Sequence, residues 1–333
     1  MGNSFWETQF VLDPPPVPVE RHGDVDLHLP PGDGQHPAVV VVHGVPGPPE
    51  APDARDWPLY RGYGALLAER GVVAAIPRLT VTHPDDLTTV ADRIAGTADL
   101  LRADPRVDRD RLALWFFSGA GLLLGDWLRD PPRWLRGLAA TYPLLAPLPE
   151  WPPVDPRFHP IDALGPTEAR ATSPHPLDSA SSHPLDSTSP HPLDSASSHP
   201  LGSTGDQPGA GPDPIARVDA GPGGSAAPRP VDPNQPPAGH GGGGVGEQGI
   251  TRGVPAGAAR SVPLVLTRVG RDRPAVASSI DTFLAAAARH GTPVRVVDVP
   301  HGQHGFDALD HTDESRAAVR TARDALLDLL THP

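Results

Sequence analysis

The fold is predicted most clearly by residues 111–124, Arg-Leu-Ala-Leu-Trp-Phe-Phe-Ser-Gly-Ala-Gly-Leu-Leu-Leu. After the arginine comes an apolar run of strand length, then Ser118 and three small residues, and a Leu-rich segment typical of a helix continues to Leu128. A sharp turn at the carboxyl end of a buried strand lifts a Ser hydroxyl above the sheet, and its bent backbone needs small neighbours. The stretch therefore predicts a strand, a tight turn that holds Ser118, and a helix.

Two roles are open to Ser118. The usual pattern of a nucleophile elbow is G-x-S-x-G, whereas Phe116 and Ala120 stand at the two glycine positions here. Ala120 is a mild change, but Phe116 places a large ring where a crossing element normally needs room. In the other interpretation, Ser118 caps the N-terminus of a buried helix, as Ser often does. These five residues alone do not choose between the two roles.

Strand patterns alternate with helix patterns along the ordered parts of the chain. The four Val residues at 39–42 are typical of a strand that is buried on both faces of a parallel sheet. The alternation predicts an α/β fold with right-handed crossovers and a doubly wound, mostly parallel sheet. Residues 25–29 alternate with period two before a turn at 30–34, which predicts an antiparallel edge hairpin. The predicted parallel strands are 38–42, 72–77, 111–117, 135–141, 262–270 and 293–299, and the predicted helices include 60–70, 85–101, 278–290 and 315–330.

Residues 166–257 interrupt this pattern with a low-complexity insert. They consist mainly of Pro, Gly, Ser, Ala, Asp and His, and a His-Pro-Leu-Asp unit begins at 175, 183 and 191 and recurs as His-Pro-Leu-Gly at 199. Such a composition buries too little apolar area to offset the entropy of ordering, so disorder is predicted. The repeated His residues suit either a metal site or a duplicated tract without rigid geometry, and we favour the tract. We expect one α/β domain formed by residues 1–165 and 258–333, with 166–257 as a flexible insert.

The composition excludes several classes of function. Among 333 residues, 40 are acidic and 27 are basic, a net charge of −13 that argues against a phosphate-backbone partner. The absence of Cys excludes disulfides, thiolate metal sites and a Cys nucleophile. No secretion signal and no membrane-spanning run is recognised in the sequence, so a cytoplasmic protein is expected. Neither a cofactor nor a metal ion is predicted, and the oligomeric state is not predicted.

Four segments in a fixed order resemble the α/β-hydrolase superfamily, and within it the dienelactone-hydrolase-like branch and related serine esterases or peptidases. The similarity covers roughly residues 20–165 and 260–331. The segments are His43-Gly44-Val45-Pro46, the turn at Ser118, Gly270-Arg271-Asp272 after a strand, and Gly302-Gln303-His304-Gly305-Phe306 after the next strand. Catalytic groups of this family follow the chain order Ser, Asp, His, each after a strand.

The resemblance implies a role for each of these groups. Ser118 would be the nucleophile, His304 the general base and then acid, and Asp272 the carboxylate that orients the imidazole. The backbone N–H groups of Val45 and Gly119 would form the oxyanion hole, where main-chain donors contribute about 3 kcal/mol each.

Several neighbours compete for these roles. His301 stands three residues before His304, but the Gly-x-His-Gly-Phe setting favours His304. Asp298 lies inside a predicted strand. Asp307 follows His304 so closely that the chain could not easily turn back to place this carboxylate against the imidazole. His43 is expected to fix its loop by hydrogen bonds to the backbone rather than to take part in chemistry.

Three functions remain open from the sequence. The first is a serine hydrolase that cleaves a small ester, lactone or acyl substrate through an acyl-enzyme. The second, suggested by Phe116, is an inactive scaffold that binds a ligand or partner. The third is an interaction tether formed by residues 166–257. The first is preferred because three separately placed polar groups fit one mechanism. Loops around Trp57, Tyr60, Leu79 and Tyr142 are expected to shape the acyl pocket.

Overall fold

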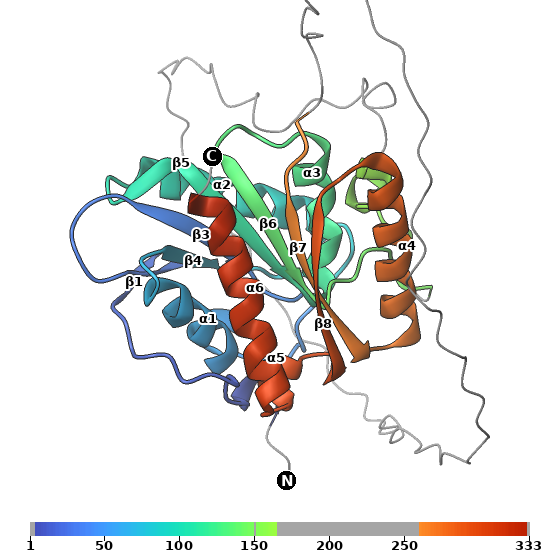
Figure 1. The fold of residues 1–333 in the computed structure, drawn as a ribbon, viewed down its shortest axis with the longest axis horizontal. Coiled ribbons are helices and arrows are strands. Elements are labelled where there is room, and N and C mark those ends of the chain that lie inside the picture. The colour runs from blue at the N-terminus through green and yellow to red at the C-terminus, as the bar shows by residue number, and fades with distance from the viewer. Residues whose placement is uncertain (1–3, 150, 165–259, 332–333) are drawn as a thin grey trace, which may run out of the picture. The chain divides into compact units, whose positions relative to one another are not determined.

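A computed structural model describes residues 4–149, 151–164 and 260–331, and these form one sheet with helices on both faces (Figure 1). The strands are β1 Val19–His22, β2 Val25–His28, β3 His36–Val42, β4 Val73–Pro77, β5 Val107–Phe117, β6 Leu135–Thr141, β7 Leu264–Arg271 and β8 Val294–Gln303. The α-helices are α1 Pro58–Ala68, α2 Asp86–Ala103, α3 Leu124–Arg129, α4 Pro274–His290, α5 Phe306–Leu309 and α6 Asp313–Thr331.

The sheet is doubly wound, as predicted. Its order is β1-β2-β4-β3-β5-β6-β7-β8, and the six strands from β4 to β8 in this order are parallel. Residues of α1 and α6 share one apolar cluster with one face of the sheet, and residues of α2, α3 and α4 share another cluster with the opposite face. The carboxyl ends of parallel strands meet at one edge, which is where sites form in such sheets.

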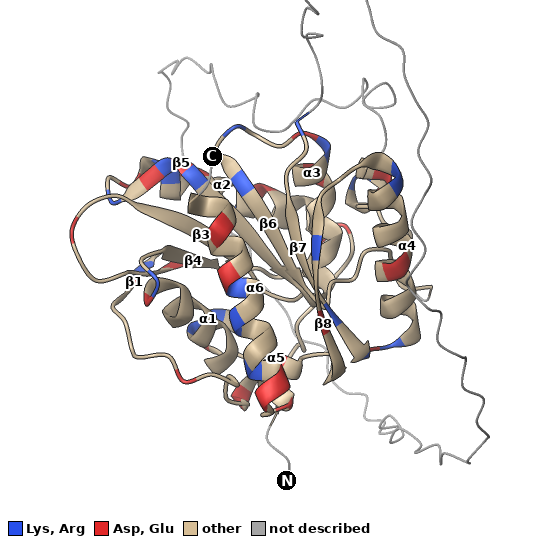
Figure 2. Ribbon diagram, viewed as in Figure 1, with Lys and Arg blue, Asp and Glu red and all other residues tan. Residues whose placement is uncertain are grey.

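The apolar run in β5 is explained by this double burial. Leu112, Leu114 and Phe116 belong to one cluster, and Trp115 and Phe117 belong to the other, because successive strand residues point to opposite faces. Charged residues lie mostly on helices and loops, whereas the central strands carry few (Figure 2). The continuous apolar pattern therefore marks the centre of the sheet.

The predicted edge hairpin forms between β1 and β2, whereas the turn at 30–34 indicates pairing of β2 with the strand that follows this turn. β2 pairs antiparallel with β1, and Gly23 in the turn between them has a φ of +58°. On its other side β2 pairs antiparallel with β4. The turn at 30–34 leads to β3, which lies beyond β4 in the sheet. The turn residues were recognised correctly, but local pattern does not specify strand order.

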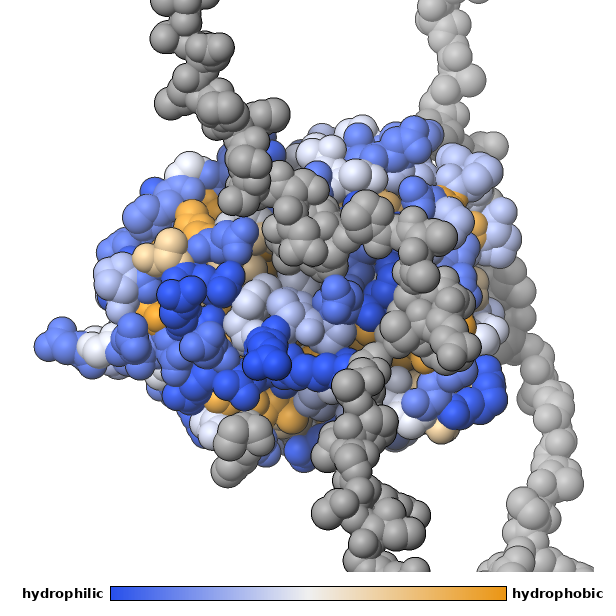
Figure 3. Space-filling view, turned by 90° about the horizontal axis from the view of Figure 1, so that it is seen from above, coloured by the Kyte–Doolittle hydropathy of each residue, from blue (hydrophilic) through white to orange (hydrophobic). Residues whose placement is uncertain are grey.

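Other expectations concern residues that the structure does not describe. The His-Pro-Leu-Asp repeat, the predicted disorder of 166–257 and the predicted boundaries at 165/166 and 257/258 all lie outside the described residues. Within the described ranges, no helix combines the length and apolarity needed to cross a bilayer. The face drawn in Figure 3 is mostly hydrophilic where it is coloured, with small apolar areas between polar side chains.

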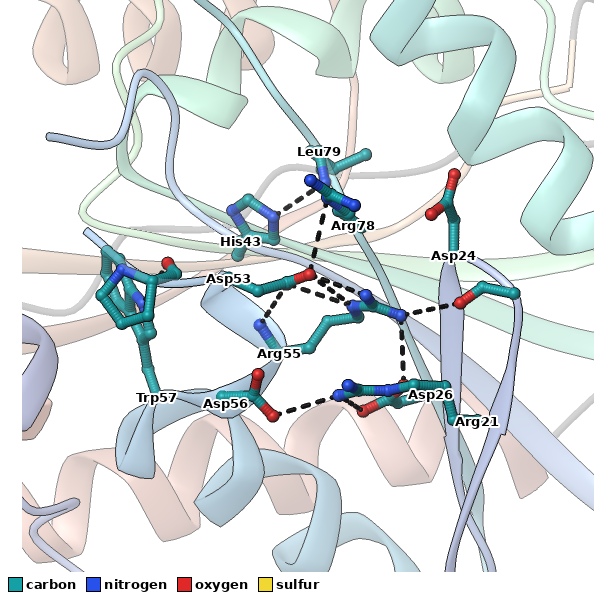
Figure 4. A network of polar contacts seen from close by, with 12 residues as sticks. Arg21, Asp24, Asp26, His43, Asp53, Arg55, Asp56, Trp57, Arg78 and Leu79 are labelled. Carbon is teal, nitrogen blue, oxygen red and sulfur yellow. Dashed lines mark hydrogen bonds and ion pairs between the residues drawn. The ribbon is translucent and has the colours of Figure 1, made fainter. Parts of the chain in front are cut away.

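A buried ion network ties the loop after β3 to the edge hairpin (Figure 4). The Arg55 side chain is 5% exposed and its guanidinium donates to both carboxylate oxygens of Asp53, to the carbonyl of Gly23 and to Asp26. Arg21 also pairs with Asp26, at 2.7 Å. Because the carboxylates of Asp26 and Asp53 are largely buried, Arg55 neutralises charge that would otherwise be costly there.

Replacing Arg55 by Met is expected to destabilise the fold by about 3 kcal/mol, because removal of one partner leaves a buried charge uncompensated. Urea unfolding measures this difference. The control is Arg78→Met, since the Arg78 side chain is 56% exposed and only approaches Asp53, at 3.5 Å. Equal unfolding free energies for the Arg55→Met variant and the unmodified protein would show that the network adds nothing to stability.

A buried histidine in β2 makes stability sensitive to acid. His28 is 2% exposed, its ring nitrogens have no hydrogen-bond partner among the described residues, and burial lowers its pKa from 6.5 to about 4. Between pH 6.5 and about pH 4, His28 is protonated in the unfolded chain but neutral in the folded chain. The free energy of unfolding therefore falls as the pH is lowered through this range. From pH 7 to pH 5 the loss from this group is about 2 kcal/mol.

The variant His28→Leu is therefore expected to lose about 2 kcal/mol less stability than the unmodified protein between pH 7 and pH 5. Urea unfolding at the two pH values gives this difference. His22→Leu is the control, because His22 lies in the adjacent strand with a side chain that is 49% exposed. An unchanged pH dependence in His28→Leu would mean that another group controls acid stability.

Candidate active site

Ser118 stands at the carboxyl end of β5 in a strained turn. Its φ is +50°, in the left-handed region that residues other than Gly rarely adopt and that costs about 1–3 kcal/mol. A 3-10 helix, Ser118–Leu123, follows directly and leads into α3. The predicted helix is therefore present, but its first two turns are wound more tightly than an α-helix. This geometry is that of a nucleophile elbow.

The large ring of Phe116 is accommodated without displacing this turn. Phe116 is fully buried in the sheet core, and its partners in the neighbouring strands are Val42 and Ala140. All three belong to the same apolar cluster, and the small side chain of Ala140 leaves space beside the ring. The sheet core therefore accommodates Phe116 at the position where the usual elbow pattern has a glycine.

The structure brings Ser118, His304 and Asp272 together from three strand ends. Ser118 Oγ lies 2.7 Å from His304 Nε2, and His304 Nδ1 lies 3.0 Å and 3.2 Å from the two carboxylate oxygens of Asp272. His304 follows β8 and Asp272 follows β7, at the same edge of the sheet as Ser118. The Asp272 side chain is fully buried and that of His304 is 27% exposed.

The competing residues lie elsewhere. The His301 side chain is 84% exposed and its Nδ1 lies 3.3 Å from a Glu314 carboxylate oxygen. Asp298 pairs with Arg268 at 2.8 Å on the surface. Asp307 is buried and accepts hydrogen bonds from tyrosine hydroxyls instead of contacting the imidazole nitrogens. Of the two histidines and three aspartates considered, the fold therefore places His304 and Asp272 at Ser118.

The two predicted oxyanion-hole residues are adjacent to each other beside Ser118. A side chain at Gly119 would bring its Cβ within 1.8 Å of the carbonyl oxygen of Val45, so the two backbones touch and only glycine fits. Gly119 is the second residue of the 3-10 helix, where N–H groups lack partners within the helix. The two backbone segments therefore touch beside Ser118, and the role of their N–H groups as an oxyanion hole stays a prediction.

If Ser118 attacks an ester at this site, Gly119→Ala is expected to lower kcat by at least about 100-fold, because the added methyl group must push Val45 or the turn out of place. Steady-state kinetics with an activated ester measures the loss. Gly47→Ala is the matched control, since nothing lies within 4 Å of a Cβ built there. Equal losses in both variants would argue against a special role for the contact between Gly119 and Val45.

His43 fixes the loop that carries Val45, as predicted. Its Nε2 accepts a hydrogen bond from the backbone N–H of Leu79 at 3.1 Å, which leaves Nδ1 to donate to the carbonyl of Gly44 at 3.1 Å. Burial lowers the pKa of His43 to about 4, so the ring is neutral at physiological pH. The Tyr60 hydroxyl supports the same loop by accepting from the N–H of Gly44 at 2.9 Å.

An apolar pocket of about 220 Å³ opens beside Val45 and Gly119. The other lining residues come from the loop after β3, from the segment after β4 and from one short stretch after β6; they are Pro46, Val81, Thr82, His83, Pro84, Leu87, Trp151 and Pro152. Of the loops that were expected to shape an acyl pocket, the one beside Leu79 lines this pocket through Val81 and Thr82. The side chains of Trp57, Tyr60, Leu79 and Tyr142 themselves are buried and do not line it.

Comparisons with known proteins give matches among solved structures. No family model and no curated protein matches the sequence. Among solved structures, the native form of esterase Est2 from Thermogutta terrifontis, a Planctomycetes species, superposes with a TM-score of 0.53 at 12% identity, covering 94% of this chain and 92% of that one. DphMB1 superposes with a TM-score of 0.50 at 16% identity, covering 96% and 88%.

The chain has the α/β-hydrolase fold. The predicted fold class is confirmed, and the predicted dienelactone-hydrolase-like branch remains a prediction, because similarity at these identities establishes the fold alone. Est2 phosphorylated by paraoxon is also similar, with a TM-score of 0.50 at 13% identity over 96% of this chain and 94% of that one. Within the described residues, no group of three or more His, Asp or Glu side chains is placed to hold a metal ion.

Proposed function

We propose that this α/β-hydrolase is a serine hydrolase that cleaves a small neutral ester through an acyl-enzyme. The observation that carries the proposal is the 2.7 Å contact between Ser118 Oγ and His304 Nε2, with Asp272 on the opposite ring nitrogen. In this arrangement Nδ1 bears the ring proton and donates a hydrogen bond to Asp272, and Nε2 is free to take the proton of Ser118. The esterases that share the fold support the same class of reaction.

In the first half of the proposed reaction, Ser118 Oγ attacks the ester carbonyl carbon while its proton passes to His304 Nε2. The negative charge that develops on the carbonyl oxygen is stabilised by the N–H groups of Val45 and Gly119. Collapse of this intermediate breaks the bond to the leaving alcohol, which takes the proton from His304. The product is an acyl group on Ser118.

In the second half, His304 removes a proton from water as the water oxygen attacks the acyl-enzyme. The second tetrahedral intermediate collapses with return of that proton to Ser118 Oγ. A carboxylic acid leaves and the enzyme is restored. Buried Asp272 stabilises the imidazolium formed in both halves.

The position of the apolar pocket supports its assignment to the acyl group. The leaving alcohol must lie beside His304, which comes from the β8 side of β5 in the sheet. The pocket segment that contains Val81 and Leu87 follows β4, on the other side of β5. A cavity of 150 Å³ accommodates benzene, so about 220 Å³ suits an apolar acyl chain of roughly six carbons.

The inactive-scaffold alternative was motivated by Phe116, and the packing of that ring removes the motivation, because Ser118 keeps hydrogen-bond distance to His304. The tether interpretation concerns 166–257, which lies outside the described residues.

A series of p-nitrophenyl esters from acetate to dodecanoate tests the proposed function. Hydrolysis is expected throughout the short and medium chain lengths, with the highest kcat/KM at about four to eight acyl carbons. The short burst of p-nitrophenol expected at high enzyme concentration would report acyl-enzyme formation. A folded protein that hydrolyses none of these esters would contradict the proposal, whereas turnover without a chain-length optimum would contradict only the acyl pocket.

A further inference from the structure

A second buried carboxylate lies behind the proposed catalytic histidine. Asp307, on α5, is fully buried and accepts a hydrogen bond from the Tyr63 hydroxyl at 2.8 Å and from the Tyr142 hydroxyl at 2.8 Å and 3.1 Å. Tyr63 lies on α1, and Tyr142 directly follows β6. The proposed reaction uses none of the three groups, so their burial together needs an explanation.

Tyr142 connects this cluster to the histidine. Its ring centroid lies 4.6 Å from that of His304, at an angle of 50° between the planes. Tyr142 also has a φ of +38°, which is unfavourable for a bulky residue and persists only where the surroundings hold it. Hydrogen bonds from its hydroxyl to Asp307 and from its N–H to the carbonyl of Thr267 fix both ends of the residue.

Asp307 carries a negative charge over much of the pH range in which an esterase works. Burial raises its pKa to about 6, although the tyrosine donors and His304 act in the opposite direction. Burial also holds the pKa of the Tyr63 and Tyr142 hydroxyls well above the ordinary value, so both remain donors. The titratable groups that face Asp307 are Tyr60 and Tyr63 from α1, Tyr142 after β6, and His304.

We propose that Asp307 is a positioning residue of the active site, which holds the His304 ring through Tyr142 and whose charge stabilises the imidazolium formed during turnover. This inference rests on the proposed function. The two carboxylates around the imidazole act differently. Asp272 accepts a hydrogen bond from Nδ1–H directly, whereas Asp307 acts through Tyr142 and through its charge.

Three variants test the proposal by the pH dependence of kcat/KM. In Asp307→Asn the acid limb is expected to move to lower pH by roughly 0.5–1 unit, because the imidazolium loses a stabilising charge. Its plateau kcat should fall about tenfold with little change in KM.

Tyr63→Phe and Tyr142→Phe each remove one hydrogen-bond donor to Asp307 and so keep its carboxyl group neutral to higher pH. Both variants should shift the acid limb of kcat/KM in the same direction as Asp307→Asn, but by less. Asp313→Asn is the control, since it removes a fully exposed carboxylate nearby.

An NMR titration of the His304 imidazole gives the same information without turnover, so failure of the proposed function and failure of this inference can be distinguished. The midpoint of that titration is expected to fall in Asp307→Asn and to stay constant in Asp313→Asn. If Asp307→Asn does not fold, the two tyrosine variants decide. Variants that lose stability while both the acid limb and the imidazole titration remain in place would show that the cluster is only part of the core.

Discussion

Ser118→Ala is expected to lower kcat/KM for p-nitrophenyl esters by at least about 10⁴-fold, because no other hydroxyl or thiol can replace the attacking oxygen in the proposed mechanism. Ser118 Oγ is the group within 2.7 Å of His304 Nε2, and the chain contains no Cys. The substitution removes one oxygen and requires no new space, so the free energy of unfolding should change little. Initial rates with purified variants measure the loss.

The control for this variant is Ser278→Ala, because Ser278 is an exposed serine on α4 and is not one of the groups that contact His304. Its activity should match that of the unmodified protein. Retention of more than about one tenth of the activity in Ser118→Ala would mean that a different group performs the attack, and the assigned nucleophile would then be wrong.

Asp272→Asn is expected to lower kcat by roughly 10³–10⁴-fold near neutral pH, the second largest effect. An amide at this position can donate to Nδ1 of His304, which would leave the ring proton on Nε2 and remove the acceptor that Ser118 needs. Because the Asp272 side chain is fully buried, water cannot readily take over the role of the carboxylate. Steady-state kinetics across the pH range measures kcat and KM separately.

Asp298→Asn provides the matched comparison for Asp272→Asn. Asp298 lies on β8, is 53% exposed and pairs with Arg268 on the surface. Loss of an exposed ion pair costs about 0–1 kcal/mol, so turnover should be nearly unchanged. If the two variants lose similar activity, the carboxylate that orients His304 would have to be reassigned.

Much of the fold was predictable because its strands are buried on both faces. The Val run in β3 and the apolar run in β5 each identify a central strand, and the apolar pattern of α4 ends at Gly291, whose φ of +68° is typical of a helix C-terminus. The order Ser118, Asp272, His304 was recognisable because each residue follows a strand, and parallel strands end at one edge.

Other features depend on contacts between distant residues, and local pattern carries no signal for them. Tyr63 and Tyr142 are far apart in sequence, yet both donate to Asp307, which the sequence presented only as a weak rival to Asp272. Phe116 departs from the elbow pattern, and its accommodation depends on a small residue, Ala140, in the next strand. The pocket is lined by the expected loop beside Leu79 but not by Trp57 or Tyr142, because the sequence does not show which loops meet in space.

Covalent labelling by a fluorophosphonate probe tests the central claim most directly. Such a probe reacts with a serine activated by a neighbouring base, and an esterase with this fold is phosphorylated by the organophosphorus compound paraoxon. We predict a single adduct on the intact protein, mapped by peptide mass spectrometry to Ser118, and lost in Ser118→Ala. A folded, unlabelled protein, or an adduct on a different residue, would contradict the account.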